Sequence, residues 1–158
     1  MHPQIEAIFD EAENRYLKPE ELTVLNQYVD SLPARLEVYQ VLRDRELEIM
    51  QPVADQLQAQ LPSAKSNDLE RSLKNALLTL RYCAMAMLLN DESFVQERLL
   101  SWLKQKAQLY NTQEIDTVLY RLLDEKLGQF LNPAQIGLLS PFLQLAKTQL
   151  VGLTSAHA

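Results

Sequence analysis

Residues that could perform chemistry are scarce in this chain and do not cluster along it. The two histidines, His2 and His157, lie near its ends, so we expect no core imidazole to serve as a metal ligand, haem ligand or general base. The single cysteine, Cys83, lies in an apolar run, which predicts a buried and unreactive thiol. No cysteine, histidine and carboxylate set has metal-site spacing, and no glycine-rich loop could hold a phosphate. The sequence therefore predicts a protein that is not an enzyme.

Charge excludes further classes of function. The run RDRELE at 43–48 resembles a catalytic acid pair, but helical spacing spreads its charges over several faces and favours a solvated exterior. A net charge of −6 would repel phosphate backbones, so nucleic-acid binding is not expected. The run at 69–91 is long enough to span a bilayer but carries four charged residues before residue 82. We therefore expect a cytoplasmic protein that is at most peripheral on the cytoplasmic face of a membrane.

The elements that position these residues are all expected to be helices. Only three glycines occur, none before Gly128, and leucine, glutamate, glutamine, alanine and arginine are abundant. The length of 158 residues predicts one domain. We divide it into an N-terminal helical extension at 1–17, a bundle at 18–151 and a frayed tail at 152–158.

The segment at 69–91 is predicted to be the central helix of the bundle. Its apolar residues occupy nearly every face, so other helices must enclose it. One stripe is expected to face inward, whereas the beginning of the helix, from Glu70 to Asn75, is expected to meet water. The stripe consists of Leu69, Leu73, Leu77, Leu80, Ala84 and Met87.

Prolines and polar pairs predict the helix boundaries around that segment. Pro33 is expected to end one helix and Pro141 to divide the last one, because proline restricts the residue before it and lacks an N–H. A long helix at 34–61 would contain Pro52 and be kinked there. Another helix is expected over 92–110, and a further one should end near Gly128.

The central segment resembles the phycobiliproteins, the light-harvesting subunits of cyanobacterial and red-algal antennae, and especially the allophycocyanin β type. That family carries the motif C-x-R-D-x-x-x-x-L-R-Y-x-x-Y-A-M-x-A-G-D. The same frame here reads SLKN at 72–75, LRY at 80–82, AM at 86–87 and ND at 90–91, without a gap. SFVQERLLSWLKQKAQLYNT at 93–112 and EAENRYL at 11–17 are similar to two further family segments. The resemblance implies an all-α, globin-like bundle of the phycobiliprotein type with a short N-terminal helical extension.

The resemblance also implies that the site for the family's linear tetrapyrrole, a bilin, is degenerate here. Family members hold the bilin by a thioether from the motif cysteine, with the arginine facing its propionates and the aspartate facing its pyrrole N–H groups. Here those positions are Ser72, Lys74 and Asn75. A hydroxyl does not replace a thiolate in the attachment, and Lys74 lacks the two-pronged geometry of arginine. We expect no covalent cofactor at these positions.

A second implication concerns assembly. In the family, an N-terminal acid and the arginine of L-R-Y belong to the contact that joins two subunits, and Glu11 and Arg81 hold those positions. We assign Tyr16 and Ile8 to the same interface, because the first helix has little beside it in sequence to cover its apolar face. Arg81 within an apolar helix needs a carboxylate partner if it is covered. Alternatively, its stem packs and its charge reaches water.

These observations predict a phycobiliprotein-like protein that lacks a covalent chromophore and acts as an assembly, regulatory or scaffold factor for phycobilisome or photosystem components. Its partner would be a second copy or another phycobiliprotein-like subunit. One alternative is a carrier that binds bilin or another tetrapyrrole without a bond, through Arg71, Lys74 and Asn75. Another alternative is a globin-like sensor or interaction module.

Overall fold

The computed structural model describes residues 2–101 and 112–155, and the regular structure within those ranges is entirely helical. This confirms the predicted all-α class. In chain order the elements are α1 (Pro3–Glu11), α2 (Pro19–Asp44), α3 (Glu46–Gln60), α4 (Ser66–Leu89), α5 (Glu92–Phe94), the π-helix η1 (Val95–Leu100), α7 (Gln113–Phe130) and α8 (Pro133–Ser155).

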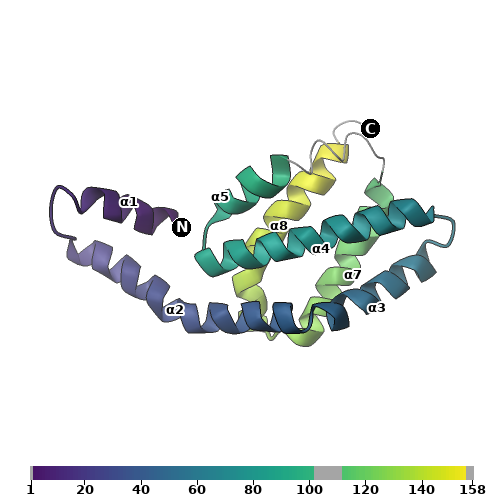
Figure 1. Cartoon of the computed structure of the whole chain (residues 1–158), viewed down its shortest axis with the longest axis horizontal. Coiled ribbons are helices and arrows are strands. Elements are labelled where there is room, and N and C mark those ends of the chain that lie inside the picture. Colours follow the sequence, from purple (N-terminus) through teal and green to yellow (C-terminus); the bar gives the residue numbers. More distant parts are fainter. Residues whose placement is uncertain (1, 102–111, 156–158) are drawn as a thin grey trace.

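Helix α4 is central to the bundle, as predicted. It contacts α2, α3, α5, η1, α7 and α8, and Figure 1 shows α7 and α8 crossing it. The predicted inward stripe is only partly correct, because Leu73 and Leu77 are half-buried. Small side chains allow neighbouring helices to approach closely. Such side chains recur every three or four residues along the deeply buried side of α4: Ser72, Ala76, Thr79, Cys83 and Ala86.

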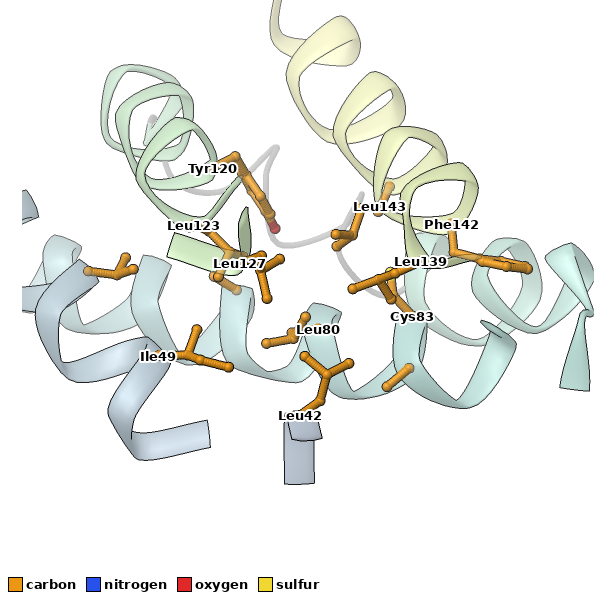
Figure 2. Close-up of a cluster of buried hydrophobic side chains, with 14 of the residues drawn as sticks. Leu42, Ile49, Leu80, Cys83, Tyr120, Leu123, Leu127, Leu139, Phe142 and Leu143 are labelled. Carbon is orange, nitrogen blue, oxygen red and sulfur yellow. The ribbon is translucent and has the colours of Figure 1, made fainter. Parts of the chain in front are cut away.

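The main hydrophobic core lies where α2, α3, α7 and α8 meet α4. Figure 2 shows side chains from these helices converging, and each leaves water almost completely on folding. This packing fixes the orientation of α4, and with it which residues α4 turns outward. The labelled core residues include Leu42, Ile49, Leu80, Leu123, Leu127, Leu139 and Phe142.

Two predicted helix breaks at prolines are wrong. Helix α2 continues through Pro33 and α8 through Pro141. Pro33 and Pro141 are exposed, so a carbonyl that loses its helical donor there is near water. The long helix predicted at 34–61 is instead divided at Arg45, where the backbone leaves the helical region with φ −115° and ψ 17°. Pro52 lies inside α3 as expected.

Several other boundaries differ from the predictions. Helix α7 ends at Phe130, close to the predicted end near Gly128, whereas α8 reaches Ser155, beyond the predicted end of the bundle at residue 151. The helix predicted over 92–110 begins at Glu92 as expected, and its part at 102–111 lies outside the described residues. The beginning of α4 is not uniformly wet, because Ser72 is only 2% exposed.

Helix α1 and the first half of α2 project from the bundle. Figure 1 shows α1 folded back along α2, with both extending beyond the other helices. We call α1 and residues 19–36 the N-terminal arm. Ile5 and Ile8 of α1 are buried, and α1 contacts α2. The arm therefore includes more of the chain than the predicted extension at 1–17.

His2 anchors the beginning of this arm and is buried, although its place near the chain end had suggested a mobile residue. Its side chain is at the N-cap of α1 and its Nδ1 accepts a 3.2 Å hydrogen bond from the Gln4 N–H. Its Nε2 lies 3.1 Å from the side-chain amide of Asn90, which ends α4 in the left-handed conformation. The sequence prediction failed because it took a chain end to be mobile. His2 is buried through its contacts with α2 and the end of α4, and these contacts cannot be read from the sequence.

Candidate functional site

The three positions of the degenerate bilin motif do not share one surface. Ser72 is buried, Asn75 is half-buried and Lys74 is exposed with its ammonium group 3.0 Å from Glu70. Residues two apart on a helix are separated by about 200° around its axis, so Ser72 and Lys74 face nearly opposite directions. The predicted residues are adjacent in sequence but are not gathered into one site.

Ser72 faces the interior beside α7. Its hydroxyl forms no hydrogen bond of acceptable geometry with the described residues. The hydroxyl does lie close to the carboxyl group of Asp116, and this proximity acts to lower the pKa of Asp116. Burial is the larger influence and raises the pKa of Asp116. Thr112 donates a 2.9 Å hydrogen bond to the same carboxyl group. One turn further along, the Tyr120 hydroxyl donates to Thr79 Oγ1 over 3.3 Å.

These residues do not fit a covalently attached bilin. Attachment needs a thiolate, and position 72 offers a hydroxyl. Cys83, the only thiol, has no exposed surface, and burial raises its pKa to about 12, which keeps it protonated. Its predicted burial is confirmed. The cations of the non-covalent alternative are also paired on the surface, since Lys74 contacts Glu70 and Arg71 contacts Asp68.

Arg81 is on the outer side of α4 and forms an ion pair within the chain. Its Nε and Nη2 donate hydrogen bonds of 2.7 and 2.9 Å to the two carboxylate oxygens of Glu46, the first residue of α3. The Arg81 side chain is 60% exposed and that of Glu46 is 29% exposed. The structure combines the two sequence interpretations: the charge of Arg81 reaches water, and it also has a carboxylate partner within the chain. The sequence did not reveal Glu46, which lies 35 positions earlier.

Two grooves flank this ion pair. The first, of about 380 Å³, runs between α2 and α4 and includes Glu46 and Arg81 in its lining. The second, of about 420 Å³, runs between α3 and α4 and includes Leu47 and Leu77. Because these leucines are close in sequence to Glu46 and Arg81, the ion pair lies where the grooves meet. Most of their surface is apolar, from Tyr39, Leu78, Tyr82, Met85 and Phe94 in the first and Leu47, Met50, Leu69, Leu73 and Leu77 in the second.

The N-terminal arm carries an uncovered apolar stripe. Leu22, Val29 and Leu36 recur every seven residues along α2 and are 45%, 50% and 46% exposed. Half-buried Leu25 and Leu32 fall between them, which completes the a and d spacing of a helix–helix seam. This spacing was visible in the sequence, but the predicted break at Pro33 concealed it.

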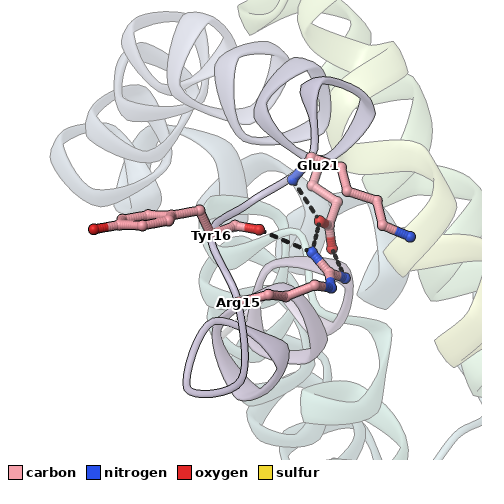
Figure 3. Close-up of polar contacts among 4 residues, drawn as sticks. Arg15, Tyr16 and Glu21 are labelled. Atoms are coloured by element: carbon pink, nitrogen blue, oxygen red, sulfur yellow. Dashed lines mark hydrogen bonds and ion pairs between the residues drawn. The ribbon is translucent and has the colours of Figure 1, made fainter.

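A salt bridge fixes the turn that joins the two helices of the arm. Arg15 donates to both carboxylate oxygens of Glu21, at 2.7 and 3.2 Å, and also to the carbonyl of Tyr16 (Figure 3). The Lys18 N–H donates to the same carboxylate over 2.8 Å. The side chain of Tyr16 points away from these contacts, and the residue is 98% exposed. The turn therefore presents an aromatic ring to water.

The remaining predicted interface residues occupy different environments. Glu11, at the end of α1, is exposed, as are Tyr16 and Arg81. Ile8 is 8% exposed, so a partner could not reach it directly. Among the described residues, Arg81 pairs with Glu46 rather than with Glu11.

An all-helical bundle built around a central helix, with a helical arm at its N-terminus, is the globin-like architecture of antenna subunits. The chain belongs to the phycobilisome protein family, because the family profile for phycobilisome proteins matches residues 8–150. This confirms the family resemblance and the globin-like fold. A search of curated proteins found no significant match.

Family membership gives a coarse functional class. Phycobiliproteins are generally non-enzymatic light-harvesting proteins, form oligomers with one another and associate with thylakoids. Within the described part of the chain, no helix combines the length and hydropathy needed to cross a bilayer.

Proposed function

We propose that this protein is a non-catalytic member of the phycobilisome family that carries no covalent chromophore and works by binding other proteins. It would serve as an assembly, regulatory or scaffold factor for phycobilisome or photosystem components. The observation that carries the proposal is the outer side of α4, where apolar residues line two grooves that no described element covers.

The occupant that best suits these grooves is the N-terminal arm of a second copy. The stripe from Leu22 to Leu36 is about 21 Å long at 1.5 Å per residue, and the α4 segment along the grooves, residues 66–85, is about 28 Å. An arm and a groove surface on the same subunit permit a two-fold dimer in which each arm lies on the other copy. This dimer would cover the side of α4 that lines the two grooves.

Charge supports the same partner. Helix α1 exposes Glu6, Asp10 and Glu11, whereas the first groove is bordered by Arg43 and Arg81. Because Arg43 and Arg81 are paired with Asp44 and Glu46 in the free subunit, these cations would orient the acids of α1 at short range rather than add a net long-range attraction. Glu11 and Arg81 are the residues that the family resemblance assigns to the contact between subunits.

The absence of an active site is part of the proposal. No group of three or more histidine, cysteine and carboxylate residues in the described ranges could hold a metal ion. Cys83 is a protonated, buried thiol, and the imidazole of His2 is used to cap α1. Both groups therefore have structural roles, and neither is an activated nucleophile or base.

Sedimentation equilibrium tests the proposed dimer. Val29→Glu puts a charge in the middle of the stripe, and Arg81→Glu reverses the cation beside the groove. We expect Val29→Glu to weaken dimerisation at least about tenfold, since an unpaired charge in an apolar contact costs more than 1.4 kcal/mol. Arg81→Glu should also weaken dimerisation, because it places a second carboxylate beside Glu46. Ala34→Glu is the matched control, because Ala34 is exposed on the opposite side of α2. Monomeric wild-type protein at all concentrations would contradict the homodimer.

A second experiment tests the broader role and the pigment. Tagged protein is recovered from a photosynthetic cell, and its partners are identified by mass spectrometry for the wild type and Val29→Glu. We expect phycobilisome or photosystem subunits with the wild type and their loss with the variant.

Protein produced in a cell that also makes bilin should be colourless. Colour in solution that disappears on a denaturing gel would instead support the non-covalent carrier.

A further inference from the structure

The Arg81–Glu46 ion pair occupies the edge of the guanidinium group that a partner would need. Nε and Nη2 both donate to Glu46, at 2.7 and 2.9 Å. This is the two-pronged arrangement in which arginine binds a carboxylate most strongly. A carboxylate from another subunit would have to use the remaining edge of Arg81 or displace Glu46.

Glu46 also reduces the attraction that Arg81 exerts on an incoming acid. Hydrogen bonding from Arg81 lowers the pKa of Glu46, so its carboxylate is ionised at neutral pH. Glu46 begins α3, where the helix dipole also favours a negative charge. An approaching carboxylate therefore meets a neutral pair, attracted by Arg81 and repelled by Glu46.

We propose that Glu46 competes with the partner's acid for Arg81 and so holds the free subunit in a form that associates weakly. When two copies meet, Arg81 of each exchanges Glu46 for Glu11 of the other copy. This inference rests on the dimer described under the proposed function and adds an autoinhibitory contact to it. The exchange occurs twice in a two-fold dimer, so it contributes twice to the free energy of dimerisation.

Glu46→Gln tests the competition by removing the charge while keeping the shape. Measured by sedimentation equilibrium, the variant should dimerise about three to ten times more tightly than the wild type, as expected for two exposed ion pairs. The gain should shrink at high salt. Glu48→Gln is the matched control, because Glu48 is also a residue of α3 paired with a neighbouring arginine, and it should leave the dissociation constant within about twofold.

A double-mutant cycle with Glu11→Gln identifies the second acid. If Arg81 is exchanged between Glu46 and Glu11, the gain from Glu46→Gln should disappear in the Glu11→Gln background. Glu46→Asp keeps the charge but shortens its reach, so it should give a smaller gain than Glu46→Gln. Thermal unfolding followed by circular dichroism verifies that each variant is folded.

Two failures are distinguishable. If the wild type dimerises and Val29→Glu abolishes this, but Glu46→Gln leaves association unchanged or weaker, the competition is refuted and the dimer stands. If the wild type and every variant remain monomeric, both the dimer and the competition are refuted.

Discussion

Arg35 of α2 closes the carboxyl end of α4 through Met87. Its Nη1 donates a 2.7 Å hydrogen bond to the Met87 carbonyl oxygen, and its Nε donates to Ser31 Oγ over 2.9 Å. Close by, the Tyr28 hydroxyl donates to the Leu88 carbonyl over 3.1 Å. The last carbonyls of a helix have no helical donors, and the helix dipole makes a cation favourable there. The arm is thereby attached to the central helix by charge and hydrogen bonding.

Replacing Arg35 by alanine should lower the free energy of unfolding by about 1.5–3 kcal/mol, the range for a hydrogen bond from a charged group. The matched control is Arg43→Ala on the same helix, because Arg43 is exposed and its salt bridge is to its sequence neighbour Asp44. Its effect should stay within about 0.5 kcal/mol. Urea unfolding of both variants gives the comparison. Equal effects would contradict the role of Arg35 as a cap.

His2 should make the stability of the arm depend on pH. Burial, and then the charge of Arg35, lowers its pKa below the ordinary 6.5, and protonation of Nδ1 would remove the acceptor for the Gln4 N–H. Because the unfolded chain binds the proton more readily, the stabilisation is complete above pH 6.5 and is lost as pH falls through the lowered value.

His2→Asn is the variant that tests this pH dependence, since asparagine is also a good N-cap and does not titrate. The difference in melting temperature between wild type and variant should change between pH 7.5 and pH 5, with the wild type losing more. A constant difference over that range would show that folding does not lower the pKa of His2.

Two leucines with opposite environments test the core. Leu123 has no exposed surface, whereas Leu47 is 74% exposed beside the second groove. Leu123→Ala should lower the free energy of unfolding by about 2–5 kcal/mol, because it removes buried carbon and leaves a cavity. Leu47→Ala should change the free energy of unfolding of the monomer, measured at protein concentrations below dimerisation, by less than about 0.5 kcal/mol. Comparable losses in urea unfolding would contradict the described packing.

Cys83 should be inert in the folded protein. The thiol is buried and its pKa is raised to about 12. At pH 8 a reagent therefore cannot reach the sulfur, and the sulfur is not in the reactive thiolate form. A colorimetric disulfide reagent should react at the rate of unfolding and quickly in urea. Fast reaction without denaturant would contradict the burial of Cys83 and reopen the possibility of a covalent ligand there.

The sequence determined the helical class, the central position of the segment at 69–91 and the family, because apolar spacing, low glycine content and the motif frame are local properties. It also identified Cys83 as buried, since the residues that follow it in the run, at 84–89, are all apolar and the one before it is aromatic. The helix ends at Pro33 and Pro141 were mispredicted because local rules do not include the contacts that hold a helix together across a proline.

The tertiary structure alone decided which residues meet. Ser72, Lys74 and Asn75 are neighbours in sequence, yet helical geometry turns the first inward and the second outward. Glu46 and Arg81 are 35 residues apart and form one ion pair. The direction of a side chain and its long-range partner depend on how α2, α3 and α4 pack. The relative placement of whole helices decides which side chains meet, and neighbours along the chain do not.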